Sequence, residues 1–112
     1  MTPADDVLSR AADLGRAVRD TPKYRALREA EAAVMKDAES VKLAQALATL
    51  QERRASLAKE GKALDPADGE RLEKIAAAAA TDPRLQALSK AQAAFQDLVN
   101  SVSRAMLDQL KP

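Results

Sequence analysis

Apolar residues in this chain recur at steps of three and four, and no stretch of useful length alternates between apolar and polar residues. The first pattern places apolar side chains on one face of a helix, whereas alternation would indicate a strand. Between Ala4 and Arg19, for example, the apolar stripe consists of Val7, Leu8, Ala11, Leu14, Gly15 and Val18. Because β-branched residues are also sparse, the pattern predicts an all-α fold.

Three Thr-Pro or Asp-Pro pairs divide the helical pattern, at Thr21-Pro22, Asp65-Pro66 and Asp82-Pro83. In each pair the first residue can cap a helix and the proline suits the first helical position. Asp37 either caps a further helix or marks only a kink, because no Gly or Pro enforces a break there. We therefore expect about four to five helices in an antiparallel bundle, over residues 4–19, 22–36, 37–63, 66–79 and 83 to the chain end.

Two of these helix starts resemble each other: TPKYRALREAEAAV at residues 21–34 and DPRLQALSKAQAAF at residues 82–95. When Pro22 is aligned with Pro83, the two segments share six identical residues. Four of these are alanines, which match easily in an Ala-rich chain. We interpret the shared pattern as a capped helix start with an apolar stripe, used twice for packing. The lone aromatics Tyr24 and Phe95 then belong to the core or anchor a subunit interface.

The predicted third helix and the residue that follows it carry leucines at heptad spacing, Leu43, Leu50, Leu57 and Leu64. Only one intermediate position, Leu47, continues the seam, so we prefer a short antiparallel helix pair to a free-standing parallel zipper.

The core is expected to be thin, because half of the 46% apolar residues are alanine, which contributes little buried area. Small domains with thin cores often gain stability from a partner subunit, so residues 1–112 are predicted to form a single, dimeric domain. The predicted core and interface residues are Tyr24, Leu27, Val34, Leu43, Leu47, Leu50, Leu88, Phe95, Leu98, Val99 and Val102.

The absence of Cys and His removes disulfides, zinc–thiolate sites and the commonest general base. No phosphate-binding glycine pattern or metal-binding loop is present either, so we predict a protein with no catalytic residues, cofactor or metal. The N-terminus lacks the features of a signal peptide, and no apolar run approaches the roughly 18–20 residues that span a membrane. We expect a cytoplasmic protein that does not insert into membranes.

The charges nearly cancel, with 18 basic and 17 acidic side chains. Such a balance gives no long-range field to concentrate polyanions, so nucleic acid is not expected as a direct partner. The densest basic stretch contains Arg53, Arg54, Lys59 and Lys62. We interpret it as a solvated helix face, and weak nucleic-acid contact through these four residues is the competing hypothesis.

Two segments contain most of the helix starts, breaks and apolar stripes described above, in a characteristic order: LGRAVRDTPKYRALREAEAAVMKDAESVKLAQALATLQ and DPRLQALSKAQAAFQDLVNSV. From about Asp5 to Leu110 the chain resembles the YlbF/YmcA-like family of small helical bacterial proteins. The resemblance implies a cytoplasmic regulator that forms homo-dimers or hetero-complexes with related helical proteins. Studied relatives act without catalysis, through a complex with a third protein, on RNA processing and development. Some relatives bind iron–sulfur clusters through cysteines, and that property does not transfer to a chain without Cys.

Overall fold

The computed structural model describes residues 2–112, which form five helices and no strand. The helices are α1 (Pro3–Arg19), α2 (Pro22–Met35), α3 (Ala38–Lys59), α4 (Pro66–Thr81) and α5 (Pro83–Asp108). The predicted all-α class with four to five helices is confirmed. None of the helices in the described part of the chain is long and apolar enough to cross a membrane.

Side-chain caps explain where most of these helices begin. Thr2 and Asp5 form a reciprocal capping box at α1. The Thr21 hydroxyl accepts a hydrogen bond from the Tyr24 N–H at 3.3 Å, which caps α2 as predicted. Asp65 occupies the predicted position before α4, but its side chain makes no capping hydrogen bond. The sequence therefore located this helix start correctly and overstated the role of the Asp65 carboxylate.

The start of α3 decides between the two interpretations of Asp37. The Asp37 carboxylate accepts the Ser40 N–H at 3.0 Å, so the residue caps a new helix rather than marking a kink. At the other end α3 stops at Lys59, short of the expected residue 63. Gly61 turns the chain with φ +71°, and the Lys62 N–H returns to the Leu57 carbonyl at 2.8 Å. Because glycine adopts positive φ without steric cost, it ends the helix there.

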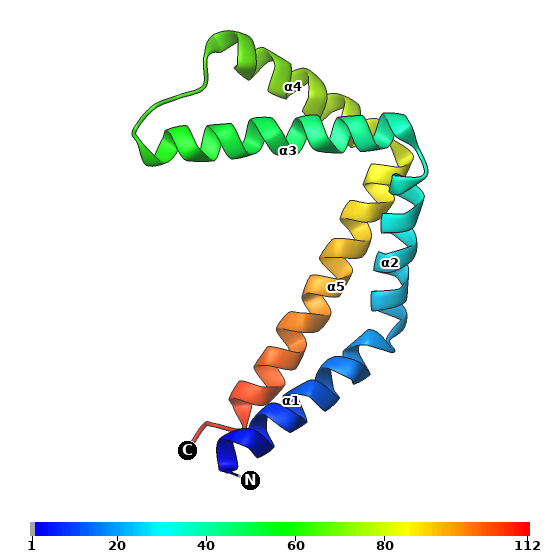
Figure 1. Ribbon diagram of the computed structural model, residues 1–112, viewed down its shortest axis with the longest axis vertical. Helices are drawn as coiled ribbons and strands as arrows, with labels where there is room; N and C mark the ends of the chain where they lie inside the picture. Colours follow the sequence, from blue (N-terminus) through cyan, green and yellow to red (C-terminus); the bar gives the residue numbers. More distant parts are fainter. Residues whose placement is uncertain (1) are drawn as a thin grey trace. The chain divides into compact units, whose positions relative to one another are not determined.

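Residue contacts group the chain into two compact units. Unit 1 comprises Met1–Glu29 and Ala91–Pro112, and unit 2 comprises Ala30–Lys90. In unit 2, α3 packs against α4, which runs back along it (Figure 1). This is the short antiparallel helix pair that the leucine spacing predicts. In unit 1, α1 lies beside the C-terminal part of α5 and runs in the opposite direction (Figure 1).

The hydrophobic core is as thin as the composition predicts. Only three apolar residues among residues 2–112 are buried, namely Val34, Leu50 and Leu72, and all three belong to unit 2. Of the predicted core and interface set, Val34 and Leu50 are buried. The remaining nine are half-buried: Tyr24, Leu27, Leu43, Leu47, Leu88, Phe95, Leu98, Val99 and Val102. The single domain and the dimer stay predictions.

Candidate interaction groove

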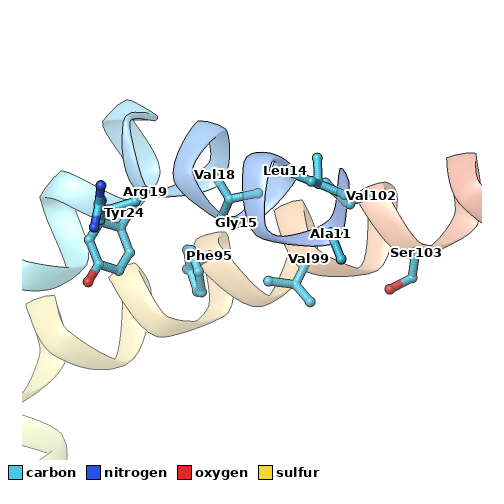
Figure 2. A pocket seen from close by; sticks show the side chains of 10 residues that line it. All are labelled: Ala11, Leu14, Gly15, Val18, Arg19, Tyr24, Phe95, Val99, Val102 and Ser103. Carbon is cyan, nitrogen blue, oxygen red and sulfur yellow. The ribbon is translucent and has the colours of Figure 1, made fainter. Parts of the chain in front are cut away.

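A groove of about 440 Å³ opens on unit 1 (Figure 2). Its lining is mostly apolar and comes from α1, from the first turn of α2 and from α5. The lining residues are Ala11, Leu14, Gly15, Val18, Arg19, Tyr24, Phe95, Val99, Val102 and Ser103. We call this site the unit 1 groove.

Helical periodicity creates this groove. On α1 the residues Ala11, Leu14, Gly15 and Val18 occupy positions i, i+3, i+4 and i+7, which keeps them on one face. On α5 Phe95, Val99 and Val102 likewise share one face. The groove forms where these two apolar stripes lie next to each other.

An aromatic pair stands at one end of the unit 1 groove, and Ser103 stands at the other (Figure 2). The ring centroids of Tyr24 and Phe95 are 5.6 Å apart, and the ring planes are tilted by 55°. Pairs with this geometry contribute about 0.5–1.5 kcal/mol beyond the area that they bury. The pair therefore joins the start of α2 to the middle of α5 within unit 1.

Gly15 is the one lining residue whose type has no explanation within the described chain, because neither its surroundings nor its backbone angles require a glycine. Its φ is not positive, and a Cβ built on it has no heavy atom within 4 Å beyond its own helix backbone and chain neighbours. A glycine inside a helix costs about 1 kcal/mol relative to alanine. At Gly15 this cost brings no closer packing within the described chain.

Large apolar side chains remain exposed on the same two helices of unit 1 and just beyond the end of α5. Their exposed fractions range from 43% to 75%. They are Val7, Leu8 and Leu14 on or near the α1 stripe, and Met106, Leu107 and Leu110 at the C-terminal end of the chain. Single exposed apolar residues are common, but several on adjoining helices beside an apolar groove are typical of a protein–protein contact surface.

Four of the predicted core and interface residues line the unit 1 groove: Tyr24, Phe95, Val99 and Val102. The other seven do not line it. The lining residues that the prediction did not include are Ala11, Leu14, Gly15, Val18, Arg19 and Ser103. The α1 stripe is present in the sequence, but its contribution to a surface is easily underestimated because two of its six residues, Ala11 and Gly15, are small.

The predicted basic stretch lies on exposed positions of unit 2. Arg53 pairs with Asp68 at 3.0 Å, and Lys62 approaches Glu60 at 3.6 Å. Arg53 and Lys59 also line a shallow hollow that includes Glu52. Acidic neighbours thus offset part of the positive charge of Arg53, Lys59 and Lys62, and all four basic residues are exposed, as expected for a solvated face. The absence of direct nucleic-acid contact stays a prediction.

A polar cluster in unit 2 connects the starts of two helices. Ser40 is fully buried, and its hydroxyl oxygen lies 2.7 Å from the Asp37 carboxylate and 2.8 Å from that of Asp82. The hydrogen bonds from Ser40 lower the pKa of Asp37, and the nearby Arg84 adds to this effect. The Leu85 N–H and the Ser40 hydroxyl lower the pKa of Asp82. Because both carboxylates cap helices, the cluster is structural.

No group of three or more acidic side chains that could hold a metal ion occurs among residues 2–112. The acidic side chains at the start of α1, Asp5 and Asp6, are exposed. Asp5 takes part in the α1 capping box.

Comparison with known proteins gives a match to the family model described as "Control of competence regulator ComK, YlbF/YmcA" over residues 7–111. Among solved structures, a "protein of unknown function (DUF964)" from Bacillus stearothermophilus is similar at 20% identity and a TM-score of 0.79, over 94% of this chain and 92% of that chain. Bacillus subtilis RicA, solved in complex with RicF, is similar at 15% identity and a TM-score of 0.72, over 95% and 97%. No curated protein sequence gives a significant match.

Proposed function

The chain belongs to the YlbF/YmcA family of competence-control regulators, and from this premise we propose that it is a non-enzymatic regulator that acts by binding other helical proteins. The partner is a second copy or a related small helical protein. The regulated process that the resemblance implies is RNA processing, which the chain influences through the proteins that it binds.

The observation that carries this proposal is the unit 1 groove with its apolar surroundings. The groove is lined mainly by apolar side chains, and large exposed apolar residues lie on the same two helices. Covering such a surface removes apolar area from water, at about 25 cal/mol per Å². A helix with an apolar face fits a site of this kind, because its side chains at steps of three and four can enter a groove between two other helices.

Two further observations support binding rather than catalysis. The relative RicA was solved in complex with RicF, so a protein with this fold can form a hetero-complex. The sequence contains neither His nor Cys, the residues that most often supply a general base or a nucleophilic thiol. The proposal therefore assigns the activity to contact surfaces.

The test places a charge in the unit 1 groove and a matched charge outside it. Val102→Asp puts a carboxylate among apolar groove residues, whereas Ser101→Asp puts one on an exposed position of the same helix. Light scattering of the purified variants, alone and with a related family member, should show association lost in Val102→Asp and kept in Ser101→Asp. Circular dichroism checks that both variants remain helical. Association that survives Val102→Asp would exclude the groove as the contact surface.

A further inference from the structure

Resting on the proposed function, we propose that the unit 1 groove receives α1 of a second copy, packed antiparallel against α1 at Ala11 and Gly15. Four features of this unit support that arrangement: an unexplained glycine, an uncovered apolar stripe, the distribution of charge along α1 and the cationic side chain at the rim of the groove.

Gly15 indicates where the second chain approaches. Within the described chain the glycine has open space around it and ordinary backbone angles, so no internal contact accounts for it. Small residues at a helix crossing let two backbones come close together. Ala11 lies one turn before Gly15 on the same lined face, so the two residues provide a shallow site for another helix.

The α1 stripe is complementary to itself when the second copy runs in the opposite direction. With the two-fold axis at Ala11, Leu8 meets Leu14 of the second copy, and Val7 meets its Gly15. Large side chains thus face small ones or extend the apolar contact. An isologous interface needs such a patch, because each copy must offer both the projecting residues and the site that receives them. Val7 and Leu8, exposed at 64% and 68%, are the projecting residues.

Charge selects the antiparallel direction. The first turn of α1 carries Asp5 and Asp6, and its last turn carries Arg16 and Arg19. A parallel pair would bring like charges together, whereas an antiparallel pair sets the acidic turn of one copy beside the basic turn of the other. The helix dipoles favour the same direction, because each positive end lies beside a negative end.

Arg19 is placed to make the specific contact. It lines the groove, and its guanidinium makes no ion pair or hydrogen bond with another residue of the described chain. Asp5 and Arg19 are separated by about four helical turns, so they flank the apolar stripe on the same side. In an antiparallel pair, residues on the same flank face each other, and the Arg19 side chain can reach Asp5 of the second copy.

Because the chain contains no Cys, single cysteine variants can map this arrangement without background. A disulfide forms only where the two Cα atoms come within about 7 Å. The pairing predicts that Ala11→Cys cross-links to itself under mild oxidation, because Ala11 lies on the two-fold axis. Ala4→Cys and Val18→Cys should not cross-link to themselves, but a mixture of the two should give a mixed dimer. Self-cross-linking of either as efficiently as Ala11→Cys would overturn the antiparallel pairing.

A glycine pair supplies the equilibrium test. Gly15→Leu fills the groove and should weaken the dimer at least about tenfold, the effect of one lost close contact. Gly69→Leu makes the same change in a helix of unit 2, where a Cβ also meets nothing within 4 Å, and should leave the dimer unchanged. An equal effect of both substitutions, or of neither, would overturn the inference.

The outcomes also separate this inference from the proposed function. If Val102→Asp abolishes association while Ala11→Cys gives no cross-link, the groove is a contact surface and the α1 pairing is wrong. If Ser103→Cys cross-links to itself in place of Ala11→Cys, α5 of the second copy occupies the groove, which also overturns the pairing. If Val102→Asp leaves association intact, the proposed function itself fails. Cross-linking at Ala11 together with loss of association in both Val102→Asp and Gly15→Leu is the result that supports both.

Discussion

The rings of Tyr24 and Phe95 lie with their centroids 5.6 Å apart, which brings the start of α2 into contact with α5 at one end of the unit 1 groove. These two residues are the only aromatics in the sequence. The large apolar surface that each ring offers is therefore used at the site that we propose for partner binding.

Replacing Phe95 by alanine should destabilise the protein by about 2 kcal/mol. Fully buried Phe→Ala substitutions cost roughly 3–5 kcal/mol, and Phe95 is only half-buried. Urea unfolding followed by circular dichroism measures the change in the free energy of unfolding. Tyr24→Phe, which keeps both rings, is the control and should change it little. Equal stability of Phe95→Ala and wild type would show that the aromatic contact does not hold unit 1 together.

Replacing Ser40 by alanine should cost about 1–2 kcal/mol, because the fully buried hydroxyl lies within hydrogen-bonding distance of the carboxylates that cap two helices and can donate to either. Thermal unfolding of the variant should therefore begin at a lower temperature than that of wild type. Ser56→Ala changes an exposed serine of the same helix and should be near neutral. If the two variants unfold alike, the Ser40 bridge does not contribute to stability.

The same cluster predicts how stability depends on pH. Folding lowers the pKa of Asp37, chiefly through hydrogen bonds from Ser40, and that of Asp82, chiefly through the Leu85 N–H. Their contribution is therefore complete above the unfolded-state pKa, near pH 4, and is lost as the pH falls through the lowered folded-state values.

Melting temperatures measured from pH 7 to pH 2 should consequently fall at the acidic end, and less steeply in Asp37→Asn than in wild type. Asparagine still caps a helix, so the variant should remain folded. An identical acid dependence of the two proteins would mean that Asp37 does not gain stability from its ionised form.

Two glycines provide a matched test of the backbone. Gly61 has φ +71°, where an alanine side chain is strained, so Gly61→Ala should destabilise by about 1 kcal/mol. Gly69 has ordinary helical angles and room for a Cβ, so Gly69→Ala should stabilise by up to about 1 kcal/mol. Chemical denaturation gives both values. The same sign for both substitutions would contradict the assigned end of α3.

The sequence predicts most of the fold because helix starts are local. Thr21 and Asp37 cap helices through N–H groups three residues away, so a short segment contains the whole interaction. The end of α3 was less predictable, because it depends on Gly61 adopting a positive φ instead of continuing the helix.

The groove and the Ser40 cluster needed the tertiary structure. The apolar stripe on α1 can be recognised from the sequence, but no local sequence feature indicates that Gly15 and Val18 line the same groove as Val99 and Val102. The structural role of Ser40 could not be predicted from the sequence either. A serine in a helix is usually solvated, and the second partner of Ser40, Asp82, is distant in the sequence.

The central claim is that unit 1 carries the association surface, and hydrogen–deuterium exchange at low and high protein concentration tests it most directly. Association through the groove should slow exchange, as concentration rises, in α1 and in the part of α5 that contains Val99 and Val102. The α3–α4 pair should exchange equally at both concentrations. Concentration-dependent protection confined to α3 and α4, or no such protection even with a related family member added, would contradict the claim.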